Sequence, residues 1–215
     1  MTLIATVFTP TCLVMGADTL IQLTPDHLST EIIGVEEIQK LFYLSKTNTG
    51  ISVRGRASWE GRSIKAILHE FSITIDSSFT QKDIAEHFNN YIRKTYPRLN
   101  TSFHLSGYTN NEPYVYDMDF DDGFQRENIE KGSLRYSVLA RVDDPEVHNK
   151  ILPLPDFSTM DIAYSIYFLD NLFKYKIEVE NKKPIPSVGY PVDYLILTPH
   201  GITKQSKRAL ADFAL

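Results

Sequence analysis

Cysteine is nearly absent from this chain, in which Cys12 is the only one among 215 residues. An intramolecular disulfide and a cysteine-rich metal site are therefore excluded. One cysteine at the start of an apolar segment is more typical of a buried residue than of a nucleophile. The shortage of cysteine also fits a reducing compartment, and we expect a cytoplasmic protein.

Long apolar runs and a basic excess are missing as well. No segment approaches the roughly 18 apolar residues that a membrane-spanning helix requires, and residues 1–5 lack the basic and apolar regions of a secretory signal. The formal net charge is −5, whereas nucleic-acid and anionic-membrane surfaces are basic. We therefore expect no membrane and no nucleic-acid partner.

The remaining composition is that of a globular protein. Hydrophobic residues make up 42% and charged residues 23% of the chain. The sequence contains no internal repeat, low-complexity tract or linker, and its length suits one core. We expect a single domain that spans residues 1–215.

Apolar segments with strand character open the chain. Residues 2–8 and 12–17 flank a short turn and predict a β-hairpin, and residues 39–44 and 50–53 predict two more strands. The polar stretch of residues 23–30 predicts a loop between these two pairs.

Helical periodicity dominates three other segments. Apolar residues spaced three and four apart predict a helix over residues 59–71. Thr80, with Asp83 three residues later, predicts the capped start of a second helix that ends before Pro97. A third helix is expected to follow Ser158.

Further strands are predicted at residues 102–105, 114–118, 136–142 and 192–197. The order is therefore strands, two helices, strands, one or two helices and a final strand. Grouped elements of this kind, rather than strict alternation, favour an α+β fold in which helices cover antiparallel sheets.

Six short segments stand in a characteristic order along the chain. They are Thr2-Leu3-Ile4-Ala5, Val14-Met15-Gly16-Ala17-Asp18-Thr19, Lys40-Leu41-Phe42-Tyr43-Leu44, Gly50-Ile51-Ser52-Val53-Arg54-Gly55-Arg56-Ala57, Ser106-Gly107-Tyr108 and Ser187-Val188-Gly189. In this order and spacing the chain resembles the proteasome β-type N-terminal nucleophile (Ntn) hydrolases. The likeness runs nearly the whole length and is most specific in the first 57 residues.

The resemblance implies a four-layer αββα sandwich, made of two antiparallel sheets flanked by helices. It also implies that identical subunits assemble into a ring whose active sites open into an enclosed chamber. The implied reaction is the hydrolysis of peptide or other amide bonds, without a cofactor.

The same resemblance assigns catalytic roles. Thr2 becomes the nucleophile once removal of Met1 frees its α-amine, which then acts as the base. Lys40 keeps that amine neutral through like-charge proximity, and Asp18 holds Lys40 in position. The backbone N–H of Gly55 stabilises the oxyanion.

Two supporting serines match the family less closely. Ser137 lacks the Gly-Ser-Gly type of turn that surrounds its counterpart in the family. The acid that family members carry three residues before the position of Ser187 is replaced here by Pro184. The sequence therefore predicts a nucleophile whose supporting residues are incomplete.

A substrate pocket is expected beside the nucleophile. Its apolar lining predicts a preference for an apolar side chain next to the scissile bond, while Arg54 and Arg56 flank it and favour substrates that carry a carboxylate. The residues expected to line it are Ile21, Ile38, Phe42, Val53 and Ala57.

Metal binding is not expected. Residues 117–123 have the composition of a calcium loop, but they follow a strand and lack the carboxylate at the twelfth position of such a loop. The six histidines show no paired ligand spacing. A solvated turn and packed or surface histidines are the simpler interpretations.

Two alternative functions stay open. The first is an Ntn amidase that acts on small amides, and the second is a non-catalytic ring or scaffold subunit. In the second case Asp18-Thr19 is merely a turn, and Lys40 is an edge-strand residue that prevents aggregation. No motif assigns an unfoldase partner.

Overall fold

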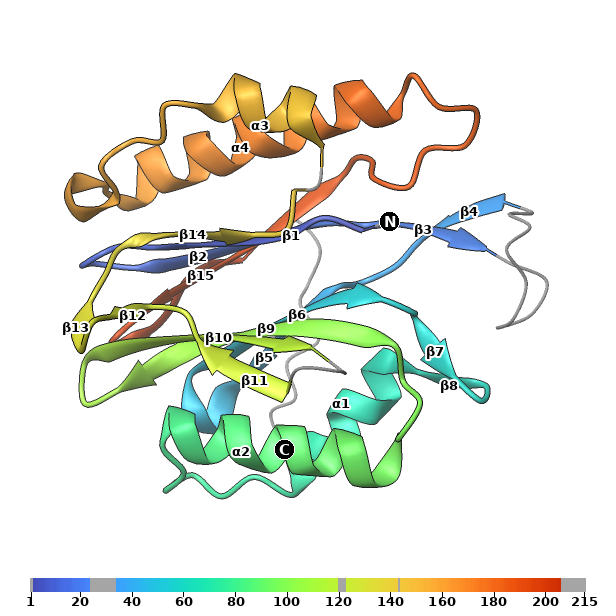
Figure 1. The fold of residues 1–215 in the computed structure, drawn as a ribbon. Coiled ribbons are helices and arrows are strands. Elements are labelled where there is room, and N and C mark those ends of the chain that lie inside the picture. Colours follow the sequence, from blue (N-terminus) through green and yellow to red (C-terminus); the bar gives the residue numbers. More distant parts are fainter. Residues whose placement is uncertain (1, 24–33, 120–122, 143, 206–215) are drawn as a thin grey trace.

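Two antiparallel sheets lie face to face, and two helices cover the outer face of each (Figure 1). This arrangement is seen in a computed structural model that describes residues 2–23, 34–119, 123–142 and 144–205. The loop predicted at residues 23–30 lies outside this part of the chain, apart from its first residue.

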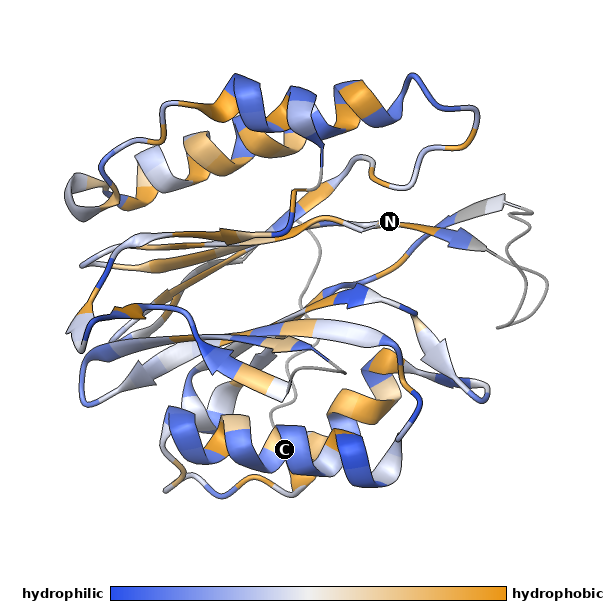
Figure 2. Ribbon diagram, viewed as in Figure 1, coloured by the Kyte–Doolittle hydropathy of each residue, from blue (hydrophilic) through white to orange (hydrophobic). Residues whose placement is uncertain are grey.

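The first sheet holds the N-terminal hairpin near its centre. Every residue of the first two strands in the chain is buried, since helices cover one face of the sheet and the second sheet covers the other. Both strands are accordingly almost wholly apolar (Figure 2). The sheet order is β14 (Ser137–Ala140), β1 (Ile4–Phe8), β2 (Leu13–Asp18), β15 (Val192–Thr198) and β16 (Gly201–Gln205).

The second sheet is built mainly from the middle of the chain. All neighbouring strands in it are antiparallel. The sheet order is β11 (Gly123–Arg126), β10 (Glu112–Asp119), β9 (Thr101–Thr109), β6 (Thr49–Gly55) and β5 (Leu41–Leu44).

Four helices and several short elements complete the described part of the chain. The helices α1 (Ile64–Ile73) and α2 (Gln81–Thr95) cover the second sheet, and α3 (Pro145–Ile151) and α4 (Ile162–Glu180) cover the first (Figure 1). The short elements are β3 (Leu20–Leu23), β4 (Gly34–Glu37), η1 (Ser45–Thr47), β7 (Ser58–Trp59), β8 (Arg62–Ser63), β12 (Ile129–Glu130), β13 (Ser133–Leu134) and η2 (Phe157–Thr159).

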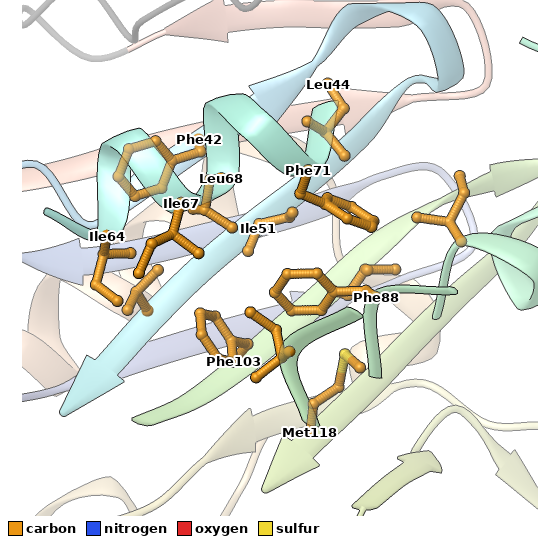
Figure 3. Packing of buried hydrophobic residues seen from close by; sticks show 14 of the residues in the cluster. Phe42, Leu44, Ile51, Ile64, Ile67, Leu68, Phe71, Phe88, Phe103 and Met118 are labelled. Atoms are coloured by element: carbon orange, nitrogen blue, oxygen red, sulfur yellow. The ribbon is translucent and has the colours of Figure 1, made fainter. Parts of the chain in front are cut away.

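Three apolar cores hold the four layers together. One lies between the sheets, one between the first sheet and α4, and one between the second sheet and the helices α1 and α2. In the third core, Phe88 of α2 contacts Phe71 of α1 and Phe103 of β9, with ring centroids 4.7 and 4.9 Å apart (Figure 3). The sequence prediction of an αββα sandwich is therefore confirmed.

The predicted helix over residues 59–71 begins too early. Glu60 and Gly61 have φ of 47° and 81°, which close a tight turn between β7 and β8. Trp59 therefore belongs to a hairpin, and α1 starts at Ile64 after Ser63, whose hydroxyl caps it. A left-handed pair interrupts the helix although the apolar spacing continues through it.

The remaining helix signals had mixed outcomes. The capping box of Thr80 and Asp83 is confirmed at the start of α2. The helix expected to follow Ser158 is α4, which begins after its N-cap Asp161, while Ser158 itself lies in η2. The second helix that the sequence left open in this region is α3, which follows the N-cap Asp144.

Candidate active site

Thr2 lies just before β1 and is almost completely buried, with 8% of its surface exposed. Lys40, just before β5, reaches across from the second sheet, and its ammonium donates to Thr2 Oγ1 at 3.2 Å. Asp18, the last residue of β2, accepts a second hydrogen bond from Lys40 Nζ at 3.1 Å. The structure thus brings together three of the residues that the sequence singled out.

Backbone groups fix the carboxylate of Asp18. Its Oδ1 accepts from the N–H of Leu3 at 2.9 Å, and its Oδ2 accepts from the N–H of Leu20 at 3.1 Å. The carbonyl of Leu20 in turn accepts from Lys40 Nζ. Asp18 therefore anchors the residue that follows Thr2 and holds the ammonium that faces Thr2.

Burial opposes the charges of this pair. It lowers the pKa of Lys40 below its ordinary value, against the attraction of Asp18. It likewise raises the pKa of Asp18, against Lys40 and the backbone donors. A buried lysine with a carboxylate partner beside a threonine hydroxyl is typical of a functional site.

The alternative that Lys40 is an edge-strand residue that prevents aggregation does not fit its burial. Its side chain is only 2% exposed, and that of Asp18 is fully buried. Burying an ion pair costs free energy that an exposed edge lysine does not. The buried pair is therefore more typical of a functional site than of a surface ion pair.

Gly55 ends β6 beside this cluster. Its φ is +118°, a conformation that residues with a side chain rarely adopt. An added Cβ atom would also lie 2.9 Å from the carbonyl oxygen of Asn100. Glycine is thus required here for both backbone conformation and space.

A cleft of about 210 Å³ opens next to Lys40. Its walls combine apolar side chains with the basic residues Arg56 and Lys65, and they include no acidic residue among those described. Its lining residues are Ile38, Gln39, Lys40, Val53, Gly55, Arg56, Ala57, Ser63, Ile64 and Lys65.

The structure places the five predicted pocket residues in two groups. Ile38, Val53 and Ala57 line the cleft. Phe42 does not, because it is fully buried in the core between the second sheet and α1. Ile21 also lies outside the lining, on β3, where it pairs with Glu36 of β4.

Ser137 is not brought to this cluster. It pairs with Phe8 at the far end of β1. Phe8 lies six residues beyond Thr2 along extended chain, a separation of about 20 Å. The strand register, which the local sequence does not reveal, removes Ser137 from the neighbourhood of Thr2.

Ser187 has an acidic partner that the sequence analysis missed. Its hydroxyl and its backbone N–H donate to Glu180 Oε2, at 2.7 and 3.1 Å. Glu180 ends α4, seven residues before Ser187, whereas the family spacing pointed to Pro184. The only sequence signal was a glutamate among lysines at the end of an amphipathic helix.

The aspartates of the supposed calcium loop have another role. Arg141 donates to Asp117 Oδ2 at 2.8 Å and to Asp119 Oδ2 at 2.6 Å. Residues 120–122 lie outside the described chain. Within the described residues, no group of three or more His, Cys, Asp or Glu side chains has the geometry to hold a metal.

Comparisons with known proteins agree on the fold. No model of a protein family and no curated protein matches the sequence. The structure is similar to that of an Anbu (Gly-1) mutant from Hyphomicrobium sp. strain MC1, with a TM-score of 0.72, 15% identity, and coverage of 99% of this chain and 88% of that one. A second structure, Anbu from the same strain, has a TM-score of 0.67 at 15% identity, with 98% and 88% covered.

The chain therefore has the sandwich fold of the proteasome-like Ntn hydrolases, as the sequence predicted. None of the helices in the described residues is both long enough and apolar enough to span a membrane.

Proposed function

We propose that this chain is a threonine-type Ntn hydrolase that cleaves peptide or related amide bonds after Met1 is removed. The observation that carries the proposal is the buried contact of Thr2, Lys40 and Asp18 beside an open cleft. A shared fold alone supports many chemistries. A hydroxyl, an ammonium and a carboxylate in one hydrogen-bonded chain support this one.

In the proposed first step, the freed α-amine of Thr2 takes the proton from Oγ1, and Oγ1 attacks the amide carbon. Lys40 disfavours a proton on that amine beforehand through like-charge repulsion. The C–N bond then breaks, the leaving amine takes the proton from the Thr2 ammonium, and an ester on Thr2 remains. Water hydrolyses this ester with the same amine as base, which regenerates Thr2.

Gly55 is proposed to supply the oxyanion donor through its backbone N–H. One such donor is typically worth ~3 kcal/mol of transition-state stabilisation. Its place at the cleft wall and its positive φ support this role, because the backbone there approaches the substrate without a side chain.

The cleft supports an apolar side chain next to the scissile bond. Ile38, Val53 and Ala57 form its apolar wall, and Arg56 and Lys65 give it positive charge. An apolar stem that ends in a carboxylate matches both features. We propose such a residue, or a small amide that carries it, as the preferred substrate.

The experiment combines intact mass with covalent trapping. Native protein is expected to lack the mass of Met1, and an epoxyketone directed at N-terminal threonine is expected to add one adduct per chain. Thr2→Ala should abolish the adduct and the cleavage of fluorogenic peptides. Thr11→Ala, in the exposed turn between β1 and β2, serves as the control and should change neither.

Retention of Met1 in native protein contradicts the catalytic proposal, because Thr2 then has no free amine. The scaffold interpretation would take its place. Trapping without cleavage of any peptide in an apolar and acidic panel would instead favour the small-amide alternative.

A further inference from the structure

Glu180 is a charged residue with no exposed surface. Its Oε1 faces two ammonium groups, Lys176 Nζ at 3.0 Å and Lys183 Nζ at 2.5 Å. Its Oε2 accepts both donors of Ser187, as described above. Glu180 thus has four donors, as many as Asp18, although it is not part of the Thr2 cluster.

The surroundings keep Glu180 ionised. Burial by itself raises its pKa, but the hydrogen bonds from Lys183, Ser187 and Lys176 outweigh burial and lower the pKa to about 2. Lys176 also lies 3.8 Å from Asp144, the N-cap of α3. These hydrogen bonds therefore favour the ionised form of the Glu180 carboxylate.

What Glu180 anchors is the segment of residues 187–191, which lies on the backbone of Asp18 to Leu20. The carbonyl of Pro191 accepts from the N–H of Thr19 at 3.2 Å and from its hydroxyl at 3.0 Å. The N–H of Gly189 donates to the carboxylate of Asp18.

Gly189 makes this close approach possible. A Cβ atom at Gly189 would lie 2.0 Å from Leu20 Cδ1. The carbonyl of Leu20 accepts a hydrogen bond from the Lys40 ammonium. Residues 187–191 therefore contact Leu20, which helps to hold that ammonium, as well as Asp18. Both partners of the buried pair thus depend on where residues 187–191 lie.

We propose that Glu180 is a positioning residue for the threonine centre: its carboxylate fixes residues 187–191, and these fix Asp18 and, through it, Lys40 at Thr2. The inference rests on the proposed hydrolase function for its catalytic consequence. It identifies an acid from the end of α4 as the partner of Ser187, in place of the acid absent at Pro184.

Two consequences separate positioning from general stability. None of residues 180–191 lines the cleft, so a loosened segment should lower kcat, by about tenfold or more, with little change in KM.

The second consequence concerns pH. Loss of the Gly189 donor removes a hydrogen bond that lowers the pKa of Asp18. The acid limb of the kcat/KM profile should therefore move to higher pH. The charged group facing Asp18 is Lys40, and those around Glu180 are Lys176, Lys183 and, through Lys176, Asp144.

The test uses Glu180→Gln in the full chain, with Glu178→Gln as the matched control. Glu178 undergoes the same chemical change two residues away, where it is half exposed and paired with Lys150 at 3.3 Å. Hydrogen exchange of the peptide that contains Gly189 is measured together with the pH profile. We expect faster exchange and a shifted acid limb in Glu180→Gln only.

Exchange does not depend on activity, so it judges the anchor even if the chain hydrolyses no substrate. Unchanged exchange and an unchanged acid limb in folded Glu180→Gln overturn the proposal. Should Glu180→Gln fail to fold, Ser187→Ala removes only one hydroxyl bond and leaves Glu180 with its lysines. It is expected to show the same two changes at smaller size, and their absence overturns the proposal equally.

Discussion

At the scale of single residues, the interior of this protein contains ionisable groups whose pKa depends on burial and on the hydrogen bonds around them. Lys40 donates a hydrogen bond to Asp18 beside Thr2, and the donors around Glu180 favour its ionised form. His104 of β9 differs, because it is fully buried and two cations, Arg54 and Arg141, lie near it. Its Nδ1 lies 3.1 Å from Thr6 Oγ1 of β1, which joins the two sheets.

His104 predicts how stability depends on pH. Burial, with Arg54 and Arg141 nearby, lowers its pKa to about 3. Between the ordinary pKa of about 6.5 and this value, the unfolded chain binds a proton that the folded chain refuses. The free energy of unfolding should therefore fall with decreasing pH in this window, by about 1.4 kcal/mol per pH unit from this residue.

Urea unfolding of wild type and His104→Gln at several pH values between 3 and 7 measures the contribution of His104. The free energy of unfolding of the variant should depend less steeply on pH, since carboxylates contribute equally to both proteins. His200→Gln, in the exposed turn between β15 and β16, should follow wild type. Parallel curves for wild type and His104→Gln would contradict the assignment.

At the scale of elements, the two sheets approach closely where a strand lacks a side chain. Gly50 of β6 faces β2 and β15 across the core between the sheets. A Cβ atom there would lie 2.5 Å from Met15 Sδ and 2.7 Å from Leu195 Cδ2. The glycine thus sets the distance between the layers that carry Thr2 and Lys40.

Gly50→Val is expected to lower the free energy of unfolding by about 1–3 kcal/mol, because the added methyl groups overpack this core. Gly50→Ala should cost less, since the end of the Met15 side chain can shift. Ser133→Val, at an exposed position of β13, is the control and should change stability by less than about 0.5 kcal/mol. A stable Gly50→Val would show that the sheets are not held at contact distance here.

At the scale of the whole molecule, the layer of α3 and α4 exposes several large apolar side chains. Tyr164 and Tyr167 of α4 are 50% and 61% exposed, with their rings stacked at 6.0 Å. Leu152 and Leu154, between α3 and η2, are 46% and 45% exposed. Tyrosine-rich apolar surface is typical of subunit contacts.

We therefore expect a homo-oligomer, with a native mass that is a multiple of 24.6 kDa in native mass spectrometry. The double variant Tyr164→Glu/Tyr167→Glu should shift the mass toward the monomer. Ile73→Glu places the same charge on an exposed residue of α1, in the opposite helix layer, and should leave the assembly intact. A monomeric wild type at micromolar concentration would contradict this prediction.

The order of elements and part of the site could be predicted from local sequence, because both depend on local patterns. The apolar runs of β1 and β2, the capping box at Thr80 and the family spacing of Thr2, Asp18 and Lys40 each involve near neighbours or a fixed order of residues. These patterns predicted antiparallel sheets covered by helices, and the family resemblance that they carry implied the αββα sandwich and the three-residue cluster.

Tertiary structure alone decided the rest. Strand register moved Ser137 away from Thr2, helix packing buried Phe42 outside the cleft, and the return of the chain after α4 brought Glu180 to Ser187. None of these depends on neighbours in sequence. Each is fixed by how β-strands pair and how layers pack, so residues far apart in the chain determine which side chains meet.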